Sequence, residues 1–277
     1  MRNQIQADFY KLTHSLLFKV ITGIMIVFLI VFMALSGDEE GITMGLIKDG
    51  AYVGKEPILQ GFMMFAYEDV KNPTSWEIIY TAVGMSFVIW IIQVTFVILN
   101  FSKDFTNGTI RLSFARGDNR YVLFLSKFIV LTISFGIMYY LFNIITYLFT
   151  LHSVAQAVTV EGFLNMLQLT TLYFLALSVL TLISMVLFCF TQNSTVTITI
   201  SIAYMLVSFF VILGQMGNEP TGLVKVFLYI SPMYYLWMDG TYWANSSIII
   251  QTILYFIISF VVLNFLGYYA LKNKEIK

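Results

Sequence analysis

The amino-acid sequence predicts an all-α membrane protein with six transmembrane helices, and three observations lead to this prediction. Hydrophobic residues make up 59% of the 277 residues and charged residues only 11%, which is too little charge to cover a water-soluble globule. Six apolar runs are each long enough to cross a bilayer. In lipid, helices are the open-ended elements that satisfy all of their own backbone hydrogen bonds.

The six runs follow one another with short or moderate connections. The fourth and fifth are separated only by Thr191, Gln192 and Asn193, which predicts an antiparallel helical hairpin. No linker is long enough to separate two domains, so residues 1–277 are predicted to form a single polytopic membrane domain. The predicted spans are 16–35, 76–99, 128–148, 168–190, 194–214 and 247–271.

The positions of the basic residues predict the orientation, because cytoplasmic loops carry an excess of Lys and Arg. With a cytoplasmic N-terminus, eleven of the 15 basic residues lie inside. Both termini are therefore predicted to be cytoplasmic, with a cytoplasmic loop at 101–127 and outer loops at 36–75 and 215–246. We expect a multi-pass protein of a bacterial cell membrane.

The last outer loop is rich in aromatic residues. Tyr and Trp gather where a helix meets the lipid headgroups, so an aromatic belt is one interpretation. A partly re-entrant outer gate is the other. The aromatic residues are Tyr234, Tyr235, Trp237, Tyr242 and Trp243.

Sequence signatures of catalysis and metal binding are missing. No H-E-x-x-H or G-x-S-x-G motif lies within a span, and the predicted topology places His14 and His152 on opposite sides of the membrane. No charged residue falls near the centre of a run, which argues against ion-coupled transport. A formal charge of zero argues against a nucleic-acid partner. We expect no catalytic residue, metal site or cofactor in this chain, and no enzymatic activity of its own.

The cytoplasmic loop carries the most information. Asn107 can cap a short helix, Ile110 and Phe114 lie four residues apart on one helical face, and Gly117 can end that helix. An amphipathic helix of this kind is suited to docking onto a soluble partner. A basic loop held against anionic lipid is an equally good interpretation on physical grounds.

The same loop resembles the loop between spans two and three of ABC-2 type permeases. In that family an acidic residue, Gly-Thr-Ile-Arg, a Gly and an Arg, and a Lys at the start of span three recur. Residues 7–12 resemble the family's amphipathic elbow helix, and residues 272–277 resemble its short charged tail. The matching loop positions here are Asp104, Gly108 to Arg111, Gly117, Arg120 and Lys127.

The resemblance implies an ABC-2 type exporter-like bundle, in which this chain is the permease subunit. Such a chain pairs with a second copy or a related permease, and with two separate ATPase subunits that would bind ATP and magnesium. The segment 107–116 would be the coupling helix. The residues implied in that contact are Asn107, Gly108, Thr109, Ile110, Arg111, Phe114 and Arg116.

The expected cargo follows from the character of the spans. Apolar spans and an aromatic, acidic outer surface suit an amphipathic or hydrophobic cargo better than an ion. Within the resembled family this indicates export of antimicrobial peptides or drugs, as immunity or self-protection. The alternative is a channel-like or scaffold membrane protein that works without ATP.

Polar residues inside two spans are candidates for the cargo path. Ser86, Gln93 and Asn100 recur every seven residues along span two, and Thr195 and Thr199 open span five. In the resembled family, spans two and five line the central path. Ordinary hydrogen bonding between helices is the alternative interpretation.

Overall fold

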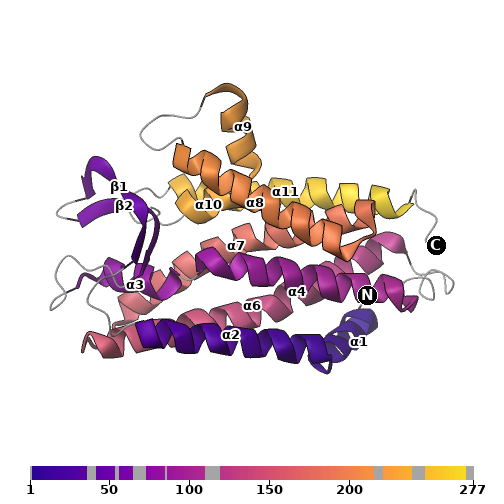
Figure 1. Cartoon of the computed structure of the whole chain (residues 1–277), viewed down its shortest axis with the longest axis horizontal. Coiled ribbons are helices and arrows are strands. Elements are labelled where there is room, and N and C mark those ends of the chain that lie inside the picture. Colours follow the sequence, from indigo (N-terminus) through magenta and orange to yellow (C-terminus); the bar gives the residue numbers. More distant parts are fainter. Residues whose placement is uncertain are drawn as a thin grey trace.

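A computed structural model describes most of the chain. The described residues are 2–35, 42–53, 56–64, 73–84, 86–109, 119–214, 221–238 and 247–272. Within them, six helices are long and apolar enough to cross a membrane, and they lie side by side along the long axis of the molecule (Figure 1). The spans are α2 (Leu16–Leu35), α3 with α4 (Ser75–Val83 and Ser86–Thr106), α6 (Arg120–Ser153), α7 (Val160–Thr191), α8 (Ser194–Gly214) and α11 (Ser247–Lys272).

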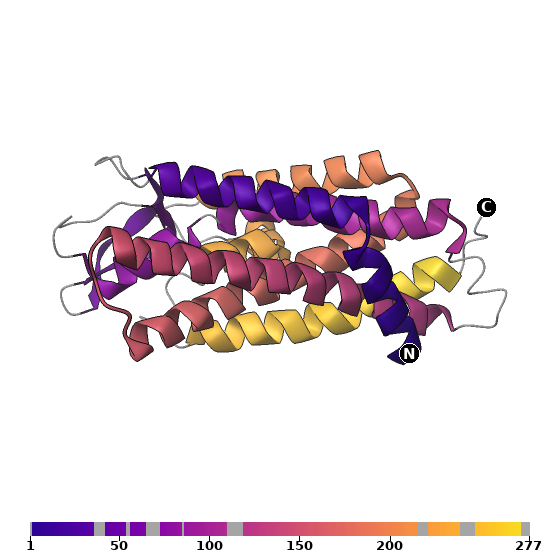
Figure 2. The same cartoon turned by 90° about the horizontal axis from the view of Figure 1, so that it is seen from below.

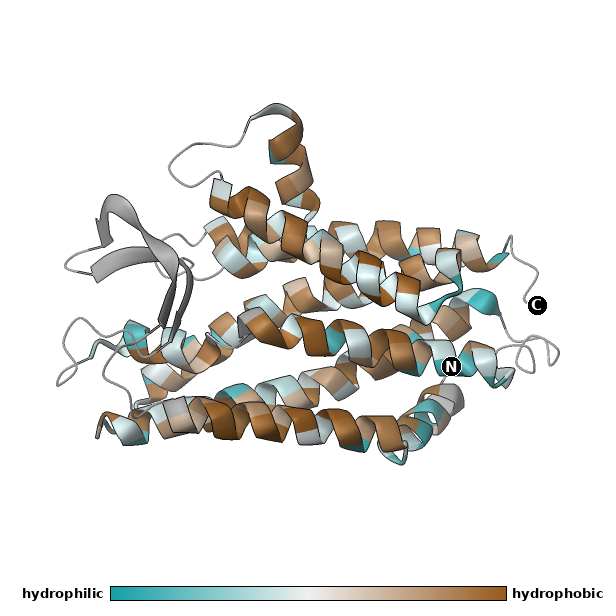
Figure 3. Ribbon diagram, viewed as in Figure 1, coloured by the Kyte–Doolittle hydropathy of each residue, from teal (hydrophilic) through white to brown (hydrophobic). Residues whose placement is uncertain are grey.

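Hydropathy follows this arrangement. Apolar residues run along the length of the helices, and the most hydrophilic residues gather mainly toward their ends (Figure 3). The structure therefore confirms a mostly helical, multi-pass membrane protein. The tight connection between the fourth and fifth spans is also confirmed, because α7 ends at Thr191 and α8 begins at Ser194, and the two helices pack together.

Helix α7 is the centre of the bundle. In its most apolar stretch 78% of the residues are buried, against 17% in α2 and 22% in α11. It packs against α3, α4, α6, α8, α10 and α11. A helix that is hydrophobic all round is expected at such a central position.

The helices extend beyond the predicted spans. Helix α6 begins at Arg120 rather than 128, and α7 at Val160 rather than 168. The side chains of Asn119 and Thr159 cap these helices by accepting hydrogen bonds from the backbone N–H groups of Tyr121 and Gly162. Hydropathy detects only the apolar part of a helix, whereas the helix itself begins at its capping residue.

The two ends of the bundle differ. Helix α1 (Arg2–Thr13) and the last turn of α11 lie at one end, which we call the terminal end (Figures 1 and 2). A two-stranded antiparallel hairpin, β1 (Ile42–Val53) and β2 (Glu56–Met64), lies at the opposite, hairpin end. Ile42 pairs with Met64 and Val53 with Glu56. This hairpin lies within the predicted outer loop 36–75 and corrects the all-α prediction, which contained no strand.

Two short helices, α9 (Gly222–Ile230) and α10 (Pro232–Met238), precede α11. Helix α10 packs against α7 and α8, and its Tyr235 and Trp237 are buried. Helix α9 projects sideways from the bundle and exposes apolar side chains, Leu223 by 88% (Figure 1). The aromatic belt and the re-entrant gate both stay predictions, and Tyr242 and Trp243 lie outside the described residues.

Candidate functional site

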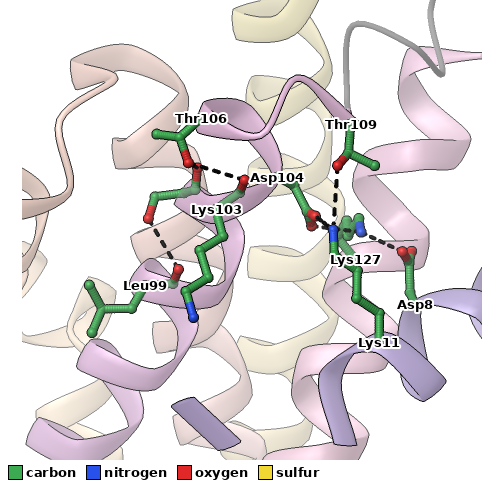
Figure 4. A network of polar contacts seen from close by, with 9 residues as sticks. Asp8, Lys11, Leu99, Lys103, Asp104, Thr106, Thr109 and Lys127 are labelled. Atoms are coloured by element: carbon green, nitrogen blue, oxygen red, sulfur yellow. Dashed lines mark hydrogen bonds and ion pairs between the residues drawn. The ribbon is translucent and has the colours of Figure 1, made fainter. Parts of the chain in front are cut away.

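Four charged side chains meet at the terminal end, where α1, α4 and α6 come together (Figure 4). The Nζ of Lys127 lies 2.7 Å from Oδ2 of Asp104 and 2.5 Å from Oδ1 of Asp8. The Nζ of Lys11 lies 2.5 Å from the other oxygen of Asp104. Lys11, Asp104, Lys127 and Asp8 thus form a chain of alternating charge, which we call the ion-pair cluster.

The cluster is largely shielded from solvent. The side chains of Asp104 and Lys127 are each 8% exposed and that of Asp8 is 13% exposed, whereas Lys11 is 47% exposed. Removing a charge from water is costly unless an opposite charge and hydrogen bonds compensate. Two carboxylates and two ammonium groups balance one another here, so Asp104 and Lys127 hold three helices in one arrangement.

Local sequence positions these groups. Asp8 and Lys11 are three residues apart on α1 and therefore share one face of it. Asp104 lies in the last turn of α4, where the helix dipole disfavours a negative charge. The two lysines offset this unfavourable position, because each places an ammonium group on one oxygen of the Asp104 carboxylate.

Asp8 is the least satisfied member of the cluster. Burial raises the pKa of its carboxyl above the ordinary value of 3.8, although the positive charge of Lys127 opposes the shift. One of its oxygens, Oδ2, has no hydrogen-bond partner within the described part of the chain. Asp8 is therefore the carboxyl of the cluster that burial biases toward protonation.

The cluster also reaches the start of the cytoplasmic loop. Helix α4 ends at Thr106, and Gly108 has a φ of +68°, a left-handed conformation that favours glycine after a helix. The hydroxyl of the next residue, Thr109, accepts a hydrogen bond of 3.4 Å from Lys11. Of the predicted coupling residues, Asn107, Gly108 and Thr109 are described. The other four, Ile110, Arg111, Phe114 and Arg116, lie outside the described residues.

The far end of the loop is fixed to a different helix. Arg120, the first residue of α6, donates from Nη1 to the backbone oxygens of Leu271 and Lys272, at 2.5 Å and 3.0 Å. These carbonyls belong to the last turn of α11, where the helix itself supplies no donors. Thr109, on one side of the loop, thus contacts α1, and Arg120, on its other side, contacts α11.

The predicted polar stripe of span two is directed into the protein. The side-chain amide of Gln93 donates to the backbone oxygen of Leu177 at 2.7 Å and to the hydroxyl of Thr181 at 2.8 Å, both on α7. Asn100 donates to the Phe96 oxygen of its own helix at 2.8 Å. It also borders a cavity of about 50 Å³ beside the ion-pair cluster. The side chain of Ser86 is not among those described.

The predicted residues of span five lie elsewhere. Thr195 and Thr199 are exposed on the outer face of α8, whereas Gln93 and Asn100 are buried. The two predicted groups are thus not brought together within one chain. Gln93 bridges α4 and α7, as expected for interhelical hydrogen bonding, and the cargo path stays a prediction.

Sequence reasoning missed the cluster as a unit. Asp104 and Lys127 were identified only through the resemblance, and Asp8 and Lys11 only as part of an elbow-like segment. A signal was present, because only 11% of the residues are charged and these four fall at the ends of predicted spans on one side of the membrane. The two ion pairs that join α1 to α4 and α6 are formed across 93 and 119 residues of sequence.

The fold and the cluster together define a multi-pass membrane protein whose N-terminal helix is fastened by buried ion pairs to the ends of two spans. The chain belongs to the family described as "Protein of unknown function (DUF2705)", whose family model matches residues 42–277. The matched range contains Asp104 and Lys127 but begins after Asp8 and Lys11. No curated protein and no solved structure matches the chain.

Proposed function

We propose that the chain is the permease subunit of an ATP-driven exporter of the ABC-2 type. The supporting observation is the convergence of Asp8, Lys11, Asp104 and Lys127 in one ion-pair cluster beside the start of the 107–116 loop. Asp104 and Lys127 are positions of the resembled motif, and the other two lie in the elbow-like segment. The contacts give these positions a common physical role, which is to fasten the loop to the bundle.

A loop fixed at both ends can pass on a displacement. A partner that moves the loop acts directly on the ends of α4 and α6. The ion-pair cluster links that motion to α1, and the contact of Arg120 with Leu271 and Lys272 links it to α11. Different contacts with the closed and open forms of an ATPase would let ATP shift the permease between two conformations.

The proposed assembly contains two ATPase subunits and a second permease, either another copy or a related chain. ATP and magnesium would be bound by the ATPase. The cargo would be amphipathic or hydrophobic, such as an antimicrobial peptide or a drug. The spans support this choice, since Asp104 and Lys127, the buried charges of the cluster, lie in the last turn of α4 and within the first eight residues of α6, toward the terminal end of the bundle.

Capture of the partner tests the proposal. Affinity-tagged protein should be purified from mildly cross-linked cells of its native source, and bound proteins identified by mass spectrometry. We expect an ATPase with a nucleotide-binding motif. Replacing both Ile110 and Phe114 by Asp should abolish its recovery, because carboxylates on a buried contact face typically cost about 2 kcal/mol or more.

Leu112→Asp is the matched control. Residue 112 lies on the opposite side of the predicted helix, so this change adds the same chemical group while leaving the contact face intact. It should retain the ATPase. If the double variant and the control both recover the ATPase as the wild type does, the coupling-helix assignment is wrong. Recovery of no ATPase from wild-type cells would favour the channel-like or scaffold alternative.

A further inference from the structure

A long apolar groove opens on the side of the bundle between α8 and α11, with α7 as its floor. Its volume is about 780 Å³. Branched aliphatic side chains form its walls, including Ile183 of α7, Ile200 of α8 and Ile258 of α11. Ile200 and Ile258 are 41% and 61% exposed, so the groove is open toward the surrounding lipid.

The groove is closed on its hairpin side by the end of α9. Tyr255 of α11 donates to the backbone oxygen of Ile230 at 2.9 Å, and Tyr235 of α10 donates to that of Tyr229 at 3.2 Å. The rings of Tyr235 and Tyr255 stack with centroids 3.9 Å apart. These hydroxyls satisfy carbonyls in the last turn of α9 that would otherwise lack donors. Both hydroxyl groups are therefore already hydrogen-bonded within the protein, so the groove offers few hydrogen-bond partners to water.

The length of the groove matches one leaflet of a membrane. Along α11 it extends from Gln251 to Leu263, and a helix rises about 18 Å over this distance. The hydrocarbon core of a bilayer is about 30 Å thick, so the groove covers slightly more than half of it. It begins beside the end of α9 and extends past the middle of the bundle, because it reaches Leu187 of α7 and Ile200 of α8 in the halves of those helices nearer the terminal end.

A positive charge stands at the hairpin side of the groove. Lys225 of α9 lies with its Nζ 5.9 Å from the ring centroid of Tyr229, which borders the groove. Lys225 is the single charged residue of α9, whose exposed apolar side chains are typical of a helix lying in the headgroup region. A basic residue at this depth is complementary to a phosphate.

We propose that this groove binds one acyl chain of an anionic phospholipid, with its headgroup beside Lys225. In the predicted topology the lipid belongs to the outer leaflet. A spanning helix from a second copy fits the groove less well, because Tyr229 and Ile230 at the end of α9 close its hairpin side. This site is independent of the proposed ATP-driven transport and requires no ATPase.

Photolabelling in nanodiscs tests whether the groove binds an acyl chain. The probe is a phosphatidylglycerol with a photoreactive diazirine on one acyl chain, diluted into phosphatidylcholine, and labelled peptides are mapped by mass spectrometry. We expect adducts concentrated on residues 179–187, 200–204 and 251–263. Labelling spread evenly over the exposed faces of α2, α8 and α11 would overturn the proposal, since it would indicate only annular lipid.

A tryptophan placed in the groove should block lipid binding, and the same substitution outside the groove is its control. Ile258→Trp should reduce groove labelling to the level on α2, whereas Val261→Trp, on the same helix and 63% exposed, should leave it unchanged. If Ile258→Trp fails to fold, Ile200→Trp on the facing wall replaces it, with the equally exposed Leu206→Trp as control. Unchanged labelling in a folded filling variant would contradict the proposal, as would a disulfide between Ile258→Cys copies in membranes.

The headgroup contact is tested separately with Lys225→Gln. Wild-type protein should prefer labelled phosphatidylglycerol to labelled phosphatidylcholine in the groove by about fivefold, the effect expected of one lysine near the membrane surface. Lys225→Gln should remove that preference, and Lys272→Gln at the terminal end should not. Equal labelling of the wild type by both lipids would refute the anionic headgroup.

Discussion

Replacing Asp104 by Asn should destabilise the bundle by about 3 kcal/mol, the lower end of the usual cost of removing one partner from a buried ion pair. Asp104 contacts both lysines of the ion-pair cluster and is 8% exposed. In the variant, the buried ammonium of Lys127 keeps Asp8 as its carboxylate partner. Lys11 is 47% exposed and can be solvated, so its loss of a partner adds little.

Unfolding can be followed through the single cysteine, Cys189, which is buried. A dye that fluoresces on reaction with thiols reports its exposure as detergent-solubilised protein is heated. For a protein of this size, about 3 kcal/mol corresponds to a fall in Tm of about 6–12 °C. We therefore expect the Tm of Asp104→Asn to lie clearly below that of the wild type.

Two further variants make the comparison specific. Lys103→Gln changes an exposed residue of the same turn, whose ammonium forms no ion pair with the described residues, and should leave the Tm within about 1 °C. The double variant Asp104→Asn with Lys127→Met removes both buried partners and should be less destabilised than the two single changes combined. A wild-type Tm in Asp104→Asn, or strict additivity in the double variant, would refute the proposed role of the ion-pair cluster.

Two other predictions concern the protonation of Asp8 and the packing of α6 on α11. Because the pKa of Asp8 is raised in the folded protein, its contribution to stability is fully present below its ordinary value of 3.8 and decreases as pH rises through the raised value. The Tm of Asp8→Asn should therefore rise relative to that of the wild type over this range, and a constant or falling difference would contradict the assignment. Gly267→Ala should lower the Tm, since its Cβ would lie 2.5 Å from the Phe124 ring, whereas Gly23→Ala meets no atom within 4 Å and should leave the Tm unchanged or raise it slightly, because Ala has the higher helix propensity. Equal effects of the two changes in the same thermal assay would argue against close packing of α6 on α11.

The six spans could be predicted because hydropathy over about 20 residues depends only on local sequence. Their ends could not, because Asn119 and Thr159 act as caps outside the apolar runs. The break between α3 and α4 near Gly84 and the β1–β2 hairpin also escaped prediction. Neither feature carries the repeated apolar pattern from which the spans were predicted.

The candidate site was predictable only in part. The loop position of Asn107, Gly108 and Thr109 follows from sequence, and Gly108 adopts a conformation typical of glycine at the end of a helix. The pairing of Lys127 with Asp8 does not follow, because 119 residues separate them and only the packing of α1 against α6 brings them together. Similarly, the sequence shows that Gln93 is a polar residue within an apolar span, but it does not show that the hydrogen-bond acceptors of Gln93 are on α7.

Contact between the 107–116 loop and a separate ATPase is the feature on which the proposed transport depends. The most direct measurement replaces Phe114 by a photo-crosslinking phenylalanine analogue and irradiates intact cells. We expect a covalent adduct with an ATPase subunit, identified by mass spectrometry, and no such adduct from the same analogue at Leu223 of α9, near the other side of the membrane in the predicted topology. Adducts at position 114 that contain only lipid, or the same adducts from both positions, would contradict the proposed function.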